Sequence, residues 1–429
     1  MPSPPSGELK RTLGSFDLIV YGVGDILGAG IYVLVGKMAG LLGNACWMAF
    51  GVAFIVASLT GLSYAELGSR FPKSAGESIF ALEAFRNRVF SYLIGFLVLL
   101  SGVVSMATVS RGFAGYVNAV WPGIPPAAII LIFFIVLAII NFWGMELSSR
   151  ANMVCTFVEV AGILIVITAG MRHFGAVNHF EITLPEGKSF STALFQGSVL
   201  GFYAFIGFED IVNVAEETHQ PTQFVPRAIL TSLGVVAVFY FLTALAAVSM
   251  VPSAELAQSS APLMKVVEKG FPGFPPSLFI LIALCAVSNT ALVNFIMGSR
   301  LLYGMARERL VPSILGRVHP TRHTPHFAIA TVFMIALILA LTGTVVLLAQ
   351  SASFLLLAVF FVMNVSLFIL KLRAADPLPS FRIPIFVPVL GALSCLFLVS
   401  YIERQAYLIV FALLLIGLVL YGIARNPAR

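Results

Sequence analysis

Residues 22–31 read Gly-Val-Gly-Asp-Ile-Leu-Gly-Ala-Gly-Ile, and apolar residues flank this stretch on both sides. Glycine loosens the helical backbone, and a carboxylate at membrane depth is costly unless it is paired or hydrated. Non-helical backbone persists at that depth only where protein or a polar cavity receives it. The stretch therefore predicts a broken membrane-spanning helix, whose free peptide groups hold a small polar solute near the middle of the bilayer. This pattern is typical of a transporter.

The composition predicts an integral membrane protein. Of the 429 residues, 59% are hydrophobic and 10% are charged, whereas soluble domains carry about 25% charged residues. Each recurring apolar stretch has about the 20 residues that a helix needs to cross the bilayer. The four cysteines fall in separate apolar segments, away from metal-ligand spacing, and we interpret them as packing residues. Neither a metal site nor another cofactor is expected.

The apolar stretches predict an all-α protein with twelve membrane-spanning helices. The first six fall near 15–40, 43–69, 90–119, 125–146, 151–171 and 192–215. The other six fall near 227–251, 275–305, 327–348, 350–372, 383–401 and 404–424. We expect a leader at 1–14, a transport core at 15–373, two peripheral helices at 383–424 and a short C-terminus at 425–429.

The positive charges predict the orientation. Most of the 25 lysines and arginines fall on the side of the predicted helices that carries both termini. Because cytoplasmic loops are enriched in these residues, both termini are expected in the cytoplasm, with the chain in the cell (inner) membrane. The net charge of +6 then reflects topology, and no nucleic-acid partner is expected.

A second interrupted helix repeats the pattern of the first. Residues 201–210 read Gly-Phe-Tyr-Ala-Phe-Ile-Gly-Phe-Glu-Asp, with glycine at mid-span and acidic residues where the helix resumes. The breaks open two groups of five predicted helices, 15–173 and 191–373. Five is an odd number, so the second group is inverted relative to the first. Broken first helices in an inverted repeat indicate a central binding site.

Several motifs, in this order and spacing, make the chain resemble the amino acid–polyamine–organocation (APC) superfamily of permeases. They are Gly-Ala-Gly-Ile at 28–31, Ser-Tyr-Ala-Glu-Leu at 63–67, Phe-Pro-Lys-Ser-Ala-Gly-Glu at 71–77, Gly-Phe-Glu at 207–209, Glu-Glu-Thr at 216–218, Ser-Arg at 299–300, Met-Ala-Arg at 305–307 and Phe-Arg-Ile-Pro at 381–384. The phrase Val-Ser-Arg-Gly-Phe-Ala-Gly-Tyr at 109–116 is similar to the cationic-amino-acid-transporter-like branch. The resemblance covers nearly the whole chain.

The resemblance implies a leucine-transporter-like core of ten helices, two peripheral helices and amino acid transport. The implied seat for the substrate carboxylate is the set of amides of Gly28, Ala29, Gly30 and Ile31, at the N-terminus of the resumed half-helix. The implied seat for the substrate ammonium is the carbonyls of Ile26, Tyr203 and Ile206, beside the second break at Gly207. Phe202 and Tyr203 either form an aromatic gate or pack in the core.

Charged residues inside the predicted helices are candidates for ion coupling. Asp25 stands where the family more often has a small apolar residue, and it either binds its neighbours' N–H groups or carries a proton or counter-charge. Glu159 stands near the position where many sodium-independent members have a lysine. It either takes up a proton, or ligates a cation together with carbonyls near Gly24 and Leu27 and hydroxyls near Ser288 or Thr290, or is a buried residue satisfied by hydrogen bonds.

Arg111 and Glu209 complete the candidates for coupling or gating. Arg111 lies too deep to reach water, so we expect it to pair with Asp25, Glu159 or Glu209. Glu209 matches the family glutamate after the second break, which implies gating or protonation. By contrast, we interpret Glu66 and Arg70 as ordinary helix-end charges near the inner surface.

The sequence thus predicts a secondary active amino acid transporter and excludes an enzyme. Uptake by proton symport is expected, with sodium coupling as the weaker choice. An amino acid exchanger or exporter, or a sensor that binds without cycling, stays open as an alternative. A buried acid near the site favours a cationic substrate, but a protonated acid is compatible with a neutral one. The sequence assigns no oligomeric state, and its expected partners are the amino acid substrate and membrane lipid.

Overall fold

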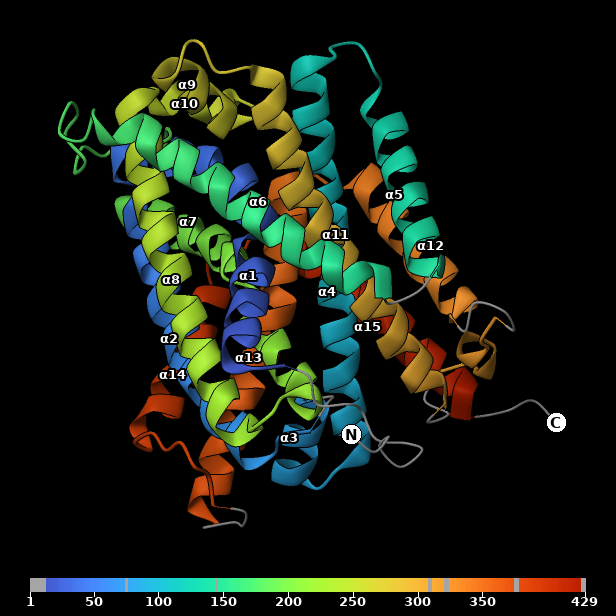
Figure 1. Cartoon of the computed structure of the whole chain (residues 1–429). Coiled ribbons are helices and arrows are strands. Elements are labelled where there is room, and N and C mark those ends of the chain that lie inside the picture. Colours follow the sequence, from blue (N-terminus) through green and yellow to red (C-terminus); the bar gives the residue numbers. More distant parts are fainter. Residues whose placement is uncertain are drawn as a thin grey trace.

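The computed structural model describes residues 13–73, 76–143, 146–307, 311–319, 324–373 and 378–425, and these parts of the chain are helical (Figure 1). The first half contains α1 (Ser15–Leu42), η1 (Gly43–Ala45), α2 (Trp47–Arg70), α3 (Gly76–Phe85), α4 (Arg88–Val120), α5 (Pro126–Trp143), α6 (Glu146–Met171), α7 (Phe190–Ala204) and η2 (Phe208–Glu217). The second half contains α8 (Pro221–Met250), α9 (Ser253–Gln258), α10 (Pro262–Gly270), α11 (Pro276–Arg307), η3 (Ser313–Gly316), α12 (His326–Thr342), α13 (Val345–Leu372), α14 (Phe386–Val399) and α15 (Arg404–Arg425).

Local sequence signals start several of these helices. Asn87 caps α4, where its side chain accepts hydrogen bonds from the amides of Val89 and Phe90. Ser189 caps α7 in the same way. α8 and α10 each begin with a proline at the first turn, where the missing N–H costs no helical hydrogen bond.

The twelve predicted segments all coincide with helices, but the count of twelve spans is not confirmed. Eight helices of the described chain are long and apolar enough to cross a membrane. The number rises to ten if each of two bent pairs is one span, namely the two halves of α1 and the pair α14–α15, which is bent by 109°. α12 has 17 residues and falls just short of that length. The short helices α3, α9 and α10 were not predicted.

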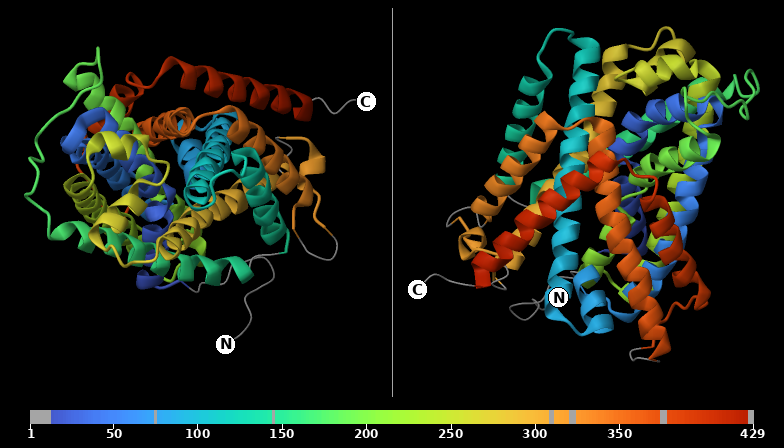
Figure 2. Two further views of the ribbon diagram at one scale, coloured as in Figure 1. Left: turned by 90° about the horizontal axis from the view of Figure 1, so that it is seen from above. Right: turned by 180° about the vertical axis from the view of Figure 1, so that it is seen from behind.

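The bundle has an apolar outer surface and a packed interior. α5 exposes Ile132 and Val136, and α15 exposes Leu408 and Phe411, as expected for helices that face lipid rather than water. Viewed from above, α6 and α15 lie on opposite edges of the bundle (Figure 2). α4 packs against α11 and α13, while α1 and α7 lie inside, enclosed by α2, α6, α8 and α13. The two interrupted helices are therefore held within the protein.

The predicted interruptions are present in both helices. Within α1, Gly28 has non-helical dihedral angles (φ −30°, ψ −140°), and the segments before and after it are bent by 42°. α7 ends at Ala204, and a turn through Gly207, with φ of +124°, leads into η2. The chain resumes there as a 3₁₀ helix rather than as the α-helix that the predicted span 192–215 would require. Both breaks lie at glycine, the residue that tolerates such backbone best.

Candidate functional site

The two breaks lie directly against each other. A Cβ atom on Gly207 would lie 2.9 Å from the carbonyl carbon of Asp25, and one on Gly30 would lie 2.5 Å from the Cα atom of Ala204. Real Cβ atoms do not come this close, so only glycine fits at either position. Small residues allow helix backbones in a membrane to approach closely. The glycines therefore have two roles. They interrupt the helices, and they allow the two interrupted segments to pack in direct contact.

A tyrosine of α8 bridges the two breaks. The hydroxyl of Tyr240 lies 2.6 Å from the carbonyl oxygen of Ile26 in α1 and 2.6 Å from that of Ala204 in α7, and it can donate its proton to either one. Tyr240 is fully buried. The sequence analysis missed this residue, and the only available signal was a polar hydroxyl inside the apolar run Val-Phe-Tyr-Phe-Leu at 238–242.

The two candidate gate aromatics point to different neighbours. The hydroxyl of Tyr203 lies 3.0 Å from Oγ of Ser105 in α4. Phe202 is buried and packs edge-on against Phe360 of α13, with ring centroids 5.7 Å apart. In this arrangement Phe202 is a packing residue, while Tyr203 connects the second break to α4. Ile206, whose carbonyl was predicted to bind the substrate ammonium, is half-buried.

Three carboxylates gather on the η2 side of the breaks. Asp25 is 5% exposed, and its Oδ2 atom has no hydrogen-bond partner in the described structure. Oε2 of Glu209 accepts a hydrogen bond of 2.9 Å from the amide of Gly207, which stabilises the turn of the second break. The charges of Asp210 and Glu209 both act on Asp25. Asp210 also contacts Asn213. The predicted proximity of acidic groups to the breaks is thus present for Asp25 and Glu209.

Glu159 lies on the opposite side of α1, between α6 and α11. Its side chain is fully buried, and neither carboxylate oxygen has a hydrogen-bond partner among the described residues. The side chain of Asn289 in α11 lies close enough to interact with this carboxylate, although not in good hydrogen-bond geometry. A Cβ atom on Gly24 would collide with Oγ1 of Thr156 in α6, and one on Gly28 would collide with Oγ1 of Thr290 in α11. α6 and α11 therefore contact the broken part of α1 on either side of Glu159.

Ser288 lies on α11, and the cation-ligating role suggested for it stays a prediction. Its hydroxyl donates a hydrogen bond of 2.6 Å to the carbonyl of Leu284, one turn earlier in α11. The next two residues of α11 are the ones that approach the site: Asn289 lies by Glu159, and Thr290 packs against Gly28 of α1. Asn289 is 3% exposed, and it was missed because a helix's rotation about its axis cannot be read from an apolar sequence.

The expected partner of Arg111 was wrong. Its Nε atom donates a hydrogen bond of 2.7 Å to the carbonyl of Ala340, near the end of α12. None of the four ion pairs between described residues includes Arg111. The physical reason is the register of α4 against α12, which brings the guanidinium to a carbonyl at a helix C-terminus, where cations are favoured. Arg111 therefore links two helices and lies apart from the carboxylates.

The amides of residues 28–31 belong to the backbone at the first break, as predicted. Gly28, Gly30 and Ile31 are buried there, and the side chain of Ala29 lies outside the described part. Within the described ranges, no group of three or more His, Cys, Asp or Glu residues could hold a metal ion.

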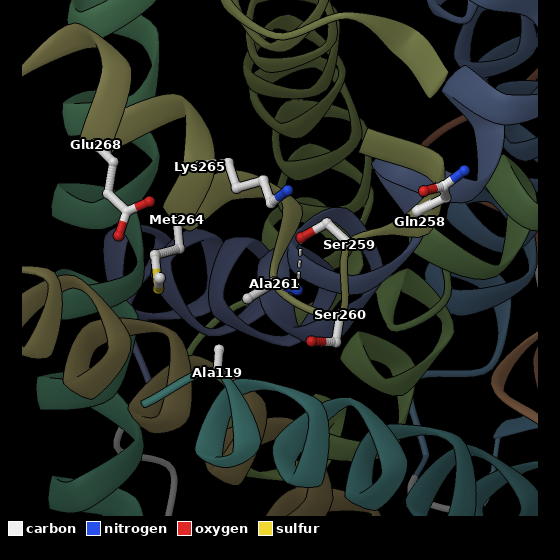
Figure 3. Close-up of a pocket in the computed structure, with 8 residues that line it drawn as sticks. All are labelled: Ala119, Gln258, Ser259, Ser260, Ala261, Met264, Lys265 and Glu268. Carbon is white, nitrogen blue, oxygen red and sulfur yellow. Dashed lines mark hydrogen bonds between the residues drawn. The ribbon is translucent and has the colours of Figure 1, made fainter. Parts of the chain in front are cut away.

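Two surface cavities of the described chain lie away from the breaks. One has a volume of about 340 Å³ and is lined by the end of α4 at Ala119 and by α10 and the segment before it (Figure 3). Lys265 and Glu268 lie on its rim, and the amide of Ala261 donates a hydrogen bond to Ser259 beneath it. No residue of either break lines it. On this side α9 packs against α1, where Nζ of Lys37 donates to the carbonyl of Ala257 over 2.8 Å.

These features define a multi-pass helical membrane protein, with two broken helices in contact at its centre. Comparison with known proteins then gives the family. Residues 13–416 match the model of the amino acid permease family, and the chain belongs to this family.

Its relatives transport different solutes, as their names state. The chain is 29% identical to the branched-chain amino acid permease BcaP of Bacillus subtilis, over 97% of this chain and 94% of the relative. It is 31% identical to the chloroplastic cationic amino acid transporter 9 of Arabidopsis thaliana, over 74% of this chain and 59% of the relative. It is 26% identical to the methylthioribose transporter of Bacillus subtilis, over 91% and 87%. The chain thus spans about three fifths of the plant transporter and nearly all of the two bacterial proteins.

Proposed function

We propose that this permease is a secondary active amino acid transporter that takes up its substrate by proton symport, through alternating access at the two breaks. The observation that carries the proposal is Glu159, a fully buried carboxylate beside the broken part of α1. Among the described residues it has no cationic partner and no well-formed hydrogen bond on either oxygen, and the side chain of Asn289 is its polar neighbour. A buried ionised carboxylate without partners is costly. Uptake of a proton, or of a cation, from one side of the membrane offsets that cost and connects ion binding to the position of α1.

Asp25 supports the same proposal from the other side of the break. Its Oδ2 atom is buried and has no hydrogen-bond partner among the described residues, while its carboxyl group interacts with the neighbouring Asp210 and Glu209. A proton bound there would reduce repulsion within the cluster. Asp25 and Glu159 thus give a coupling proton two binding groups beside α1, the helix that also binds the substrate in this proposal.

The proposed architecture has twelve spans, with α1, α2, α4, α5 and α6 as the first repeat and α7–η2, α8, α11, α12 and α13 as the inverted second repeat. α14 and α15 follow as the peripheral pair, and both termini lie in the cytoplasm. The contact between the breaks of α1 and α7 supports this assignment, because the first helices of inverted repeats meet at the pseudo-symmetry axis.

The backbone at the breaks supplies the substrate seat in this proposal. The substrate carboxylate binds the amides of residues 28–31, at the N-terminus of the second half of α1. The substrate ammonium binds the carbonyls of Ile26 and Ala204. Because the Tyr240 hydroxyl occupies both carbonyls in the closed structure, the ammonium has to displace it. Backbone groups then bind what all amino acids share, and the side-chain class depends on α4, α11 and α13.

The substrate itself is an amino acid of either the branched-chain or the cationic class. The names of the relatives support both, and the relative that transports methylthioribose adds a neutral thioether sugar to the set worth testing. A lysine or arginine side chain would find a counter-charge at Asp25 or Glu159. A leucine side chain would instead require those acids to be neutral during transport.

The test is uptake of radiolabelled amino acids and methylthioribose into proteoliposomes, with an inward proton gradient, an inward sodium gradient or neither. Symport predicts accumulation only with the proton gradient, and loss of that accumulation in Asp25→Asn or Glu159→Gln while exchange persists. Uptake that requires an amino acid preloaded inside would make the protein an exchanger. Saturable binding without any uptake would make it a sensor.

A further inference from the structure

Two cysteines on neighbouring helices lie in contact. Sγ of Cys285 in α11 is 3.1 Å from Sγ of Cys155 in α6. Both residues are partly exposed, whereas Cys46 and Cys395 are fully buried. All four are free thiols in the structure. The first pair therefore differs from the others in having a second thiol within reach and a path to the outside.

We propose that Cys155 and Cys285 form a redox modification site, at which oxidation produces a disulfide that staples α6 to α11. A disulfide has an S–S distance of about 2.05 Å, so the two sulfurs have to approach by only about 1 Å. The two S–H bonds break and one S–S bond forms. Two electrons and two protons pass to a two-electron oxidant that dissolves in lipid, such as a fully substituted quinone, which becomes a hydroquinone.

The position of the pair explains how the oxidant reaches it. α6 lies at one edge of the bundle (Figure 2), and its outward face exposes Met153, Val154 and Phe157 next to Cys155. This face is apolar, as expected for contact with lipid. A reagent dissolved in the bilayer therefore meets this thiol pair first, and a charged reagent confined to water meets it poorly.

The staple would hold the two helices that contact the broken part of α1. Thr156, the residue after Cys155, packs against Gly24, and Glu159 follows one turn later. On α11, Asn289 lies one turn after Cys285, and Thr290 packs against Gly28. A covalent bond between α6 and α11 fixes their spacing on both sides of α1. This part of the inference rests on the proposed function, since it concerns movement of α1 during transport.

Oxidation therefore has two expected effects, one chemical and one functional. The chemical effect is a Cys155–Cys285 linkage that a reductant reverses. The functional effect is loss of uptake, because α6 and α11 can no longer move relative to each other around the broken part of α1, as the proposed alternating access requires. Neither effect involves Cys46 or Cys395, which are buried, and Sγ of Cys395 lies 3.8 Å from the hydroxyl of Thr60.

The experiment uses the full-length protein in proteoliposomes, treated with diamide, a membrane-permeant two-electron oxidant, and then with a reductant. Peptide mass spectrometry after alkylation of free thiols looks for the linked peptides, and uptake is measured in parallel. Cys155→Ser and Cys285→Ser should each abolish the linkage and make uptake resistant to diamide. Cys46→Ser and Cys395→Ser are the matched controls, and they should remain as sensitive as the parent protein.

The outcomes separate the two parts of the inference. Absence of the linked peptides in diamide-treated protein would overturn the modification site. A complete linkage with unchanged uptake would overturn the staple as a block to transport. The mass measurement does not depend on transport, so absence of uptake by the reduced protein would reject the proposed function while the linked peptides still decide the site.

Discussion

The hydroxyl of Tyr240 lies 2.6 Å from the carbonyl oxygen of Ile26, at the point where α1 loses its helical hydrogen bonds. The same hydroxyl is equally close to the carbonyl of Ala204, where α7 ends. One side chain of α8 thus serves both interruptions. Unpaired carbonyls are costly inside a membrane protein, and this contact pairs one carbonyl at each break.

Tyr240→Phe is expected to remove that contact and to change the protein in two ways. Loss of a donor from buried carbonyls should lower the free energy of unfolding by about 1–3 kcal/mol. Substrate should then raise the thermal unfolding temperature more than in the parent, because its ammonium no longer competes with the phenol. Thermal unfolding in detergent with and without substrate measures both effects. The matched control is Tyr407→Phe, whose hydroxyl donates to the carbonyl of Val399 far from the breaks. Equal substrate effects in both variants would contradict the prediction.

Gly207→Ala is expected to disrupt the contact between the breaks. The residue has φ of +124°, and an added Cβ atom would lie 2.9 Å from the carbonyl carbon of Asp25. Backbone strain alone costs about 1–3 kcal/mol, and the overlap adds to it. We expect reduced yield of folded protein and loss of uptake in what remains. Gly234→Ala in α8 is the control, because nothing lies within 4 Å of its Cβ position. A fully active Gly207→Ala would refute the close packing.

Glu159→Gln is expected to abolish proton-driven accumulation but to keep exchange. The amide cannot release a proton, yet it fills the same space between α6 and α11. The measurement is uptake over a range of inward proton gradients, compared with exchange at equal pH. Glu268→Gln, on the exposed surface of α10, is the control and should respond to the gradient like the parent. Accumulation by Glu159→Gln at the parental level would exclude this residue as the proton carrier.

Folding stability is expected to depend on pH through Glu77 of α3. Burial, together with the charge of Asp210, raises the pKa of this carboxyl group to about 8. A carboxyl group with a raised pKa in the folded state contributes stability below its unfolded pKa of about 4.5. That contribution is lost as the pH rises through about 8. Unfolding temperatures from pH 5 to 9 should therefore decline less in Glu77→Gln than in the parent. Parallel curves would contradict the assignment.

Lys371→Met tests a buried ion pair between α13 and α2. Nζ of Lys371 lies 2.6 Å from Oε2 of Glu66, which is fully buried and also pairs with Arg70 at 2.9 Å. Removal of one partner from a buried pair costs about 3–5 kcal/mol. The control is Lys265→Met, which removes an exposed pair with Glu255 and should change little. Similar unfolding temperatures for the two variants would show that Glu66 does not need Lys371.

The sequence predicted features that depend on local chemistry. The breaks at Gly28 and at 205–207 follow from glycine within apolar runs, and the helical segments follow from their length. Features that depend on how distant helices meet were missed or wrong. Tyr240 and Asn289 carry no local signal that distinguishes them from packing residues, and the partner of Arg111 depends on the register of α4 against α12.

Glu66 shows the same limit. It was interpreted as an ordinary helix-end charge, but its side chain is fully buried and holds a lysine of α13 and the amide of Ile383. The motif at 63–67 and the motif at 381–384 thus meet in space, 317 residues apart in the chain. A single sequence gives the two motifs but no indication that one completes the other.

This contact has a consequence for the order of events during synthesis. α2 enters the membrane with Glu66 long before the ribosome has made Lys371 and Ile383, so the carboxylate has only Arg70 as a partner during that interval. The early half of the bundle is therefore incomplete until the last helices arrive. A nascent chain that stops before residue 371 would leave Oε2 of Glu66 without the ammonium and the amide that it contacts in the folded protein, so α2 cannot reach its final packing before α13 and the segment at 381–384 are made.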